Sequence, residues 1–175
     1  IIDEYLYCET LGKSGKEPVL AAIQRQDEKF AGGILAVANH VSTICDRPSM
    51  LTFLGSVDSQ EEFIRDRLAA EVNPMFLYTE GDSPTIVKRR FVEIYPLQKL
   101  FELYVMGDSG TRPNDVDALC EKLVEVLPAY DLVVVLDYGH GMLGPEAVEL
   151  LCDRARFLAV NTQVNAGNRG FNTVS

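Results

Sequence analysis

The segment Asp131-Leu-Val-Val-Val-Leu136 constrains the fold of this chain more than any other stretch. After Asp131 every residue is apolar, so neither face of a strand here would carry polar side chains. Such a strand must be covered on both faces, as in parallel sheets with helices on each side. A helix is expected from Pro145 to about Ala155, followed by another buried strand at 157–160. The sequence therefore predicts an α/β fold with parallel strands.

The rest of the chain divides into an α/β body and a smaller β-layer. Ala31-Gly32-Gly33 opens an apolar helix expected to run to about Cys45, and Ser59-x-x-Glu62 has the spacing of a capping box. The other expected body elements are strands at 50–57 and 74–79 and helices at 59–72 and 114–127. Alternating segments at 5–8, 19–23, 85–95 and 99–106 fit a β-lid built from about 5–24 and 85–106, with the last two paired as a hairpin.

The chain shows no internal repeat or linker, so residues 1–175 are expected to form a single domain. Its last stretch, Asn165 to Asn172, is rich in Gly and Asn and has no closing helix. Because a parallel sheet would normally continue past such a point, we expect a partial domain, a fragment of a longer protein.

Composition excludes several classes of function. The 16 Lys and Arg residues face 26 Asp and Glu residues, and a net charge of −10 disfavours binding to nucleic acid or to anionic membranes. No apolar run approaches the roughly 20 residues of a membrane helix. The first residues lack the pattern of a charged and then apolar leader, so we expect no signal peptide. The four cysteines form no C-x-x-C pair, and the two histidines have no zinc spacing. We expect reduced, buried thiols, no metal site and a cytoplasmic protein.

Polar residues at strand ends are the first candidates for a site. Asp137-Tyr-Gly-His-Gly141 follows the most apolar strand, where open α/β sheets bind ligands, although Asp137 would equally suit a cap of the local turn. Asn161-Thr-Gln163 follows the next strand, with more amides at Asn165, Asn168 and Asn172. Amides suit hydroxyl-rich ligands because they both donate and accept hydrogen bonds, and they suit ordinary turns as well.

Lys88-Arg89-Arg90 is the densest positive cluster of the chain. On a strand, Lys88 and Arg90 share one face, where they would contact an anion such as a phosphate or pair with the many carboxylates. Gly12-Lys13-Ser14 suggests a P-loop, but that motif needs a glycine where Tyr7 stands and a helix after the loop. A hairpin tip is the better interpretation.

Six motifs occur in a familiar order: Ile1 to Tyr5, Ser14 to Val19, Ala31-Gly32-Gly33, Pro84 to Arg90, Gln98 to Leu100 and Asp137 to Gly141. Together they resemble the ribokinase-like (PfkB) carbohydrate kinases, most closely the heptose 7-phosphate kinase branch, which is often fused to a cytidylyl- or adenylyltransferase domain. The resemblance covers essentially the whole chain. It implies a ribokinase-like parallel sheet flanked by helices with a small β-lid, incomplete at the C-terminal, nucleotide-binding side.

The resemblance also implies a set of substrate-binding residues. Asp3, Gly32, Gly33 and Asp137 would hold the sugar, Lys88 and Arg90 would contact a substrate phosphate where there is one, and His140 and Asn161 would complete the set. The catalytic base would lie outside this chain, because the family's Gly-Ala-Gly-Asp motif does not occur in it. ATP and Mg2+ would serve the intact protein, and neither is expected to bind this chain, which alone should be inactive.

The chain departs from the family at three places. Ala36 stands where the family has Asn, His140 where it has Lys, and Asn161-Thr-Gln163 where it has Asp-Pro-Lys. Two hypotheses follow: the acceptor-binding part of a sugar kinase, or a non-catalytic sugar-binding or regulatory module linked to a nucleotidyltransferase domain. A nicotinamide-binding domain is disfavoured because no Gly-x-Gly-x-x-Gly follows the first strand. The apolar faces of the thin lid further predict a lid-mediated homodimer.

Overall fold

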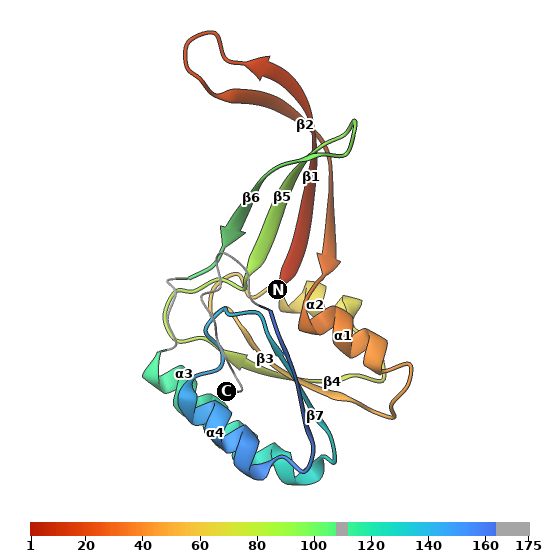
Figure 1. The fold of residues 1–175 in the computed structure, drawn as a ribbon, viewed down its shortest axis with the longest axis vertical. Coiled ribbons are helices and arrows are strands. Elements are labelled where there is room, and N and C mark those ends of the chain that lie inside the picture. Colours follow the sequence, from red (N-terminus) through yellow and green to blue (C-terminus); the bar gives the residue numbers. More distant parts are fainter. Residues whose placement is uncertain (108–111, 164–175) are drawn as a thin grey trace.

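A four-stranded sheet stands away from the helices and forms the long axis of the molecule (Figure 1). In this computed structural model, which describes residues 1–107 and 112–163, the strand order of this lid sheet is β2-β1-β5-β6. Its strands are β1 (Ile2–Lys13), β2 (Leu20–Ala31), β5 (Val87–Glu93) and β6 (Lys99–Val105). β1 is antiparallel to β2 and parallel to β5, and β5 and β6 form the expected antiparallel hairpin.

The hairpin of β1 and β2 extends furthest from the helices (Figure 1). At its end the Ser14 backbone amide donates a hydrogen bond to the Val19 carbonyl at 2.8 Å. Lys13, the lysine of the P-loop-like segment, is the last residue of β1, so this segment forms a hairpin tip, as the sequence predicts. Both strands are longer than the expected segments, because the residues on either side of those segments also pair, from Ile2 with Ala31 to Lys13 with Leu20.

Parallel strand pairs form the body and confirm the predicted α/β architecture. β3 (Ser49–Leu54) is parallel to β4 (Asn73–Tyr78), and β7 (Val133–Asp137) is parallel to β8 (Leu158–Thr162). Among the described residues these are two separate two-stranded sheets. The expectation of a fully buried strand at 157–160 is wrong at Phe157, which is 64% exposed just before β8.

Helices pack against both faces of β3, because its side chains alternate between two cores. Met50 and Leu54 join the core of α1 and α2, whereas Leu51 and Phe53 pack against the core of α3 and α4. The helices are α1 (Ile34–Val41), α2 (Glu61–Arg67), α3 (Pro113–Val126) and α4 (Pro145–Arg154), with a short 3-10 turn at Leu127–Ala129. None of the helices in the described ranges has the length and apolar character needed to cross a membrane.

Two helix predictions need correction. α1 ends at Val41 rather than near Cys45, and α2 covers Glu61–Arg67 rather than 59–72. The capping box is also wrong, since Gln60 is the N-cap residue and makes no side-chain cap hydrogen bond. The backbone before α2 contacts the segment before β5 instead, because the Ser59 carbonyl accepts a hydrogen bond from the Thr85 hydroxyl at 2.7 Å.

The four cysteines are free thiols, as the sequence predicts, but only Cys8 is buried. Cys120 is half-buried, and the prediction of burial is wrong for Cys45 and Cys152, which are exposed. Cys45 lies in the turns that follow the shortened α1, and Cys152 lies on α4, whose buried stripe is formed by Ala147 and Leu151.

Candidate functional site

Asp137 lies at the carboxyl end of β7, the position where open α/β sheets bind ligands. Its side chain is buried, and one carboxylate oxygen accepts a hydrogen bond from the Gly139 amide at 2.8 Å. Gly139 and Gly141 have φ values of 69° and 82°, a conformation that glycine adopts without strain. Asp137 therefore shapes the loop after β7, as the turn-capping interpretation expected, and its role toward a ligand stays a prediction.

Gly32 and Gly33 bring the start of α1 against two other parts of the predicted site. A Cβ atom at Gly32 would lie 2.8 Å from Asp3 Cγ and closer still to a carboxylate oxygen of Asp3. A Cβ at Gly33, where φ is 54°, would lie 3.4 Å from the ring of Tyr138. The paired glycines thus let the first turn of α1 approach both the base of β1 and the loop after β7.

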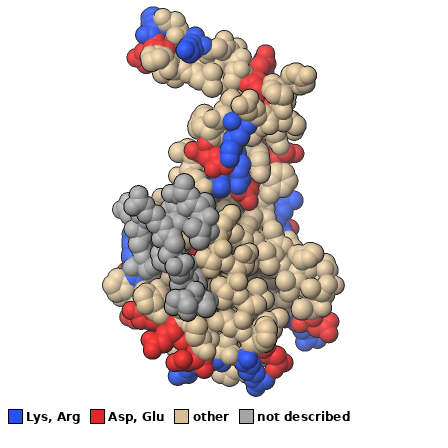
Figure 2. All heavy atoms as spheres, in the orientation of Figure 1, with Lys and Arg blue, Asp and Glu red and all other residues tan. Residues whose placement is uncertain are grey.

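Lys88 and Arg90 extend from β5 on one face of the lid sheet, as their spacing predicts. Arg90 forms an ion pair with Asp3, and its Nε lies 3.4 Å from a carboxylate oxygen of Glu102. Lys88 Nζ lies 3.5 Å from the other oxygen of Glu102 and 5.1 Å from the ring centre of Tyr104. We call these five residues the charged face of the lid: Asp3, Lys88, Arg90, Glu102 and Tyr104. Figure 2 shows basic and acidic atoms side by side along the same sheet.

Lys88, Arg90 and Glu102 of the charged face are ionised at neutral pH. Burial acts to lower the pKa of Lys88, but a hydrogen bond with Tyr104 and the charge of Glu102 outweigh it, so the pKa is raised. Burial likewise acts against Arg90, and its hydrogen bond to Asp3 leaves its pKa raised. The pKa of Glu102 is lowered, chiefly by a hydrogen bond from Lys99.

His140 connects the loop after β7 with the lid. Its ring centre lies 6.2 Å from that of Tyr104 on β6. Burial lowers the pKa of His140, the positive charge of Lys88 lowers it further, and Asp137 opposes both. His140 is therefore neutral at pH 7, so the position where the family resemblance expects a lysine carries no cation.

Replacing Lys88 with Gln should raise the pKa of His140 toward its ordinary value near 6.5, because one of the charges that disfavour the imidazolium is removed. Because the pKa of His140 is lower in the folded chain than in the unfolded chain, His140 adds to the free energy of unfolding above pH 6.5, and this contribution is lost as the pH falls. An NMR titration of the His140 ring protons measures the shift. Lys29→Gln is the matched control, since Lys29 pairs with Glu4 on the other face of the lid. Equal His140 pKa values in both variants would contradict the prediction.

Asn161 lies apart from the contacts described so far. It is exposed on β8, where it pairs in register with Leu136, and the next residue, Thr162, pairs with Asp137. The Gln163 amide donates to the Asp137 carbonyl at 2.9 Å, so the end of β8 is bound to the end of β7. The amides predicted at Asn165, Asn168 and Asn172 lie outside the described residues.

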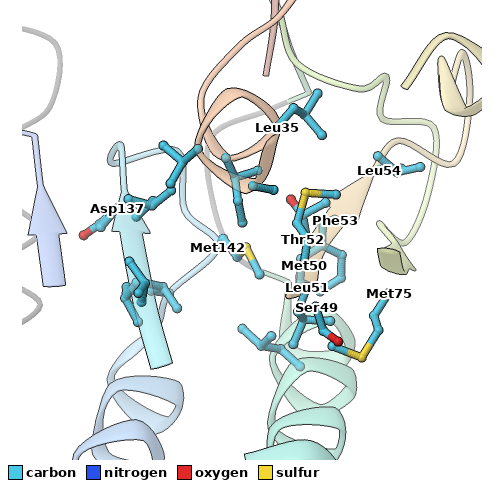
Figure 3. Close-up of a pocket in the computed structure, with 18 of the residues that line it drawn as sticks. Leu35, Ser49, Met50, Leu51, Thr52, Phe53, Leu54, Met75, Asp137 and Met142 are labelled. Carbon is cyan, nitrogen blue, oxygen red and sulfur yellow. The ribbon is translucent and has the colours of Figure 1, made fainter. Parts of the chain in front are cut away.

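A cavity of about 760 Å³ extends from the carboxyl ends of β3 and β7 down between these two strands. In Figure 3, Asp137 lies on one side and the β3 residues on the other, with Met142 between them. Asp137 and His140 are the predicted site residues that line it, and its walls are otherwise largely aliphatic. A hydroxyl-rich ligand needs polar partners, so we place the candidate site at the polar mouth, beneath the charged face of the lid.

Sequence reasoning missed Glu102, Tyr104 and Tyr138. Glu102 and Tyr104 were predictable in principle, because period-two alternation and the β5–β6 hairpin place them opposite Arg90 and Lys88. Tyr138 gave no such signal, since its contact with Gly33 depends on how the loop after β7 lies against α1.

Comparison with known proteins identifies the fold. The chain is similar to phosphofructokinase-2 from Escherichia coli in complex with fructose-6-phosphate, with a TM-score of 0.63, 14% identity, and coverage of 94% of this chain and 52% of that one. It is also similar to a possible 1-phosphofructokinase from Thermotoga maritima, with a TM-score of 0.58, 15% identity, and coverage of 91% and 50%. The chain has a ribokinase-like fold. The parallel strands, flanking helices and β-lid expected from the resemblance are thereby confirmed.

A curated sequence relative matches the whole length of the chain. The bifunctional protein HldE of Koribacter versatilis is 26% identical over 185 residues, covering 100% of this chain and 37% of the relative. No protein-family model matches the sequence. The chain thus spans about a third of the length of this curated relative and about half of the solved ribokinase-like chains.

Proposed function

We propose that this chain is the acceptor-binding part of a PfkB-type sugar kinase, and that residues 1–175 are one partial ribokinase-like domain. In the intact protein the reaction would be ATP-dependent, Mg2+-assisted phosphorylation of a hydroxyl on a sugar or sugar phosphate. The ribokinase-like fold supports a protein of the sugar-kinase type. Free thiols and an acidic surface suit a cytoplasmic enzyme that binds neither nucleic acid nor membranes.

The observation that carries the proposal is the convergence of α1, β1 and the loop after β7. Gly32 packs against Asp3 and Gly33 against Tyr138, so two carboxylates, Asp3 and Asp137, lie on segments joined by the start of α1. Carboxylates accept hydrogen bonds from sugar hydroxyls, and the amides at a helix start favour electron-rich oxygen. The charged face of the lid lies above this mouth, where His140 meets Tyr104.

The acidic residues of the candidate site do not resemble a dedicated Mg2+ site. In residues 1–107 and 112–163 no group of three or more His, Cys, Asp or Glu side chains could hold a metal ion. Asp3 is bound to Arg90, and Asp137 accepts from the Gly139 amide, so neither is arranged as a dedicated Mg2+ ligand. In this proposal ATP and Mg2+ serve the intact protein.

Binding and turnover test the proposal together. The 175-residue chain, titrated by calorimetry with uncharged hexoses and heptoses and with fructose 6-phosphate, should bind at least one sugar. The chain alone should not transfer phosphate from ATP, whereas the longer protein that contains it should. The proposal would be refuted if the chain bound none of these compounds and the longer protein phosphorylated none of them.

One observation favours a second candidate, a non-catalytic sugar-binding or regulatory module linked to a nucleotidyltransferase domain. His140 is neutral at pH 7 and stands where the resemblance expects a lysine, so the site has one cation fewer than the family pattern. A longer protein that binds a sugar but gives no ATP-dependent product under the same conditions would favour this module over the kinase.

We also propose that the lid mediates a homodimer. The lid sheet exposes large apolar side chains, which thin β-layers bury by pairing. They include Leu11, Leu20, Ile23, Phe30, Phe101 and Leu103. Light scattering at micromolar concentration should give the mass of two chains, and Phe101→Glu with Leu103→Glu should give one. Val124→Glu, at an exposed apolar residue of α3, is the control and should remain a dimer. A single-chain mass for the wild type would end this proposal.

A further inference from the structure

Glu102 lies between the two cations that the sequence assigns to an anionic ligand. It stands on β6 as the register partner of Arg90. Its carboxylate oxygens lie 3.5 Å from Lys88 Nζ, 3.4 Å from Arg90 Nε and 2.7 Å from Lys99 Nζ. The Glu102 side chain is only 21% exposed, so this carboxylate is held within the cluster rather than extended into solvent.

The positive charges of Lys88 and Arg90 are therefore already neutralised by ion pairs within the chain when no ligand is bound. Arg90 is paired with Asp3 as well as with Glu102, and Lys88 is paired with Glu102. Both cationic side chains are largely covered, at 23% and 18% exposed, so their ion pairs are less screened than surface pairs. A phosphate that bound here would have to displace Glu102 or accept its repulsion.

We propose that Glu102 is a specificity-determining residue, a built-in anion that occupies Lys88 and Arg90 so that the site selects an uncharged, hydroxyl-rich ligand over a phosphorylated one. This inference rests on the proposed sugar-binding function and narrows its substrate class. Hydroxyl groups donate to carboxylates and accept from ammonium groups, so an uncharged sugar binds without breaking the Glu102 ion pairs. The oxygens of an anionic phosphate group accept hydrogen bonds from Lys88 and Arg90 and so compete with Glu102 for the same donors.

Inorganic phosphate is the probe for this inference, and calorimetric titration of the full chain is the measurement. Glu102→Gln keeps the size of the side chain and removes its charge. We expect the affinity for phosphate to rise at least about tenfold, which corresponds to about 1.4 kcal/mol. Fructose, as an uncharged probe, should gain no affinity from this substitution, since no charge is displaced when it binds.

Glu9→Gln is the matched control. Glu9 lies in the same lid sheet and pairs with Arg25 at 2.7 Å, half-exposed and apart from the charged face. It changes the net charge equally, so a general electrostatic effect would raise phosphate affinity in both variants. The double variant Lys88→Gln with Glu102→Gln should not show the increased phosphate affinity expected for Glu102→Gln alone.

The outcomes separate this inference from the proposed function. Equal phosphate affinity in the Glu102→Gln and Glu9→Gln variants, or no phosphate binding by either, would overturn the role of Glu102. Failure to bind any uncharged sugar would count against the sugar-binding function, while the difference between the two variants would still decide whether Glu102 competes with phosphate.

Discussion

Replacing Gly55 with Ala should destabilise the fold by at least about 3 kcal/mol, the largest effect we expect from a single methyl group. Gly55 follows β3, and its Cβ would lie 2.5 Å from the Ser83 carbonyl oxygen and closer still to the backbone of Pro84 and Thr85. Backbone atoms cannot move aside as the end of a flexible side chain can. The Gly55 amide also donates to the buried Thr85 hydroxyl at 2.8 Å, and the added methyl group would push these segments apart.

Denaturant unfolding followed by circular dichroism measures this change. Gly15→Ala is the control, because a Cβ at Gly15 meets no atom within 4 Å, and it should alter the unfolding free energy by less than about 0.5 kcal/mol. Similar stability in the Gly55 and Gly15 variants would show that the segment 83–85 is not packed against the end of β3. The connection matters for the site, because Val87 and the rest of β5 follow this segment directly.

Replacing Asp137 with Ala should weaken binding of the chain's preferred uncharged sugar by roughly 1–3 kcal/mol, or about 5- to 150-fold. The substitution removes the buried carboxylate at the end of β7, so the sugar would lose the hydrogen bonds that its hydroxyl groups donate to Asp137. The same change also removes the acceptor for the Gly139 amide, so a loss of affinity alone could come from a distorted loop.

Asp137→Asn separates the two causes. Its amide oxygen can still accept from the Gly139 amide, whereas the negative charge that favours hydroxyl donors is gone. We expect near wild-type thermal stability and at least about fivefold weaker sugar binding, measured by calorimetry. Unchanged sugar affinity in both variants would leave Asp137 with the turn-capping role alone.

Many elements of the fold were predictable from the sequence, because their signals are local. The apolar stretch that becomes β7, the helix opening at Pro145 and the β5–β6 hairpin lie where their patterns place them. The failures lie where tertiary contacts compete with local preference. The Ser59 carbonyl binds Thr85 and the predicted capping box does not form, while Cys45 and Cys152 are exposed.

The sequence by itself determined which side chains share a face and which segments open with glycine. Lys88 and Arg90 face one way because a strand repeats every two residues, and Gly32-Gly33 permits a close approach by the start of α1.

Only the tertiary structure decided what these groups meet. Arg90 pairs with Asp3 across 87 positions of sequence, and Glu102 reaches Lys88 and Arg90 through the register of a hairpin. Periodicity fixes the face of a residue but not its partner strand or register, which depend on burial and packing across the whole sheet. Whether the lid cations are open to a ligand is therefore a property of the fold, and Glu102 shows that they are already paired.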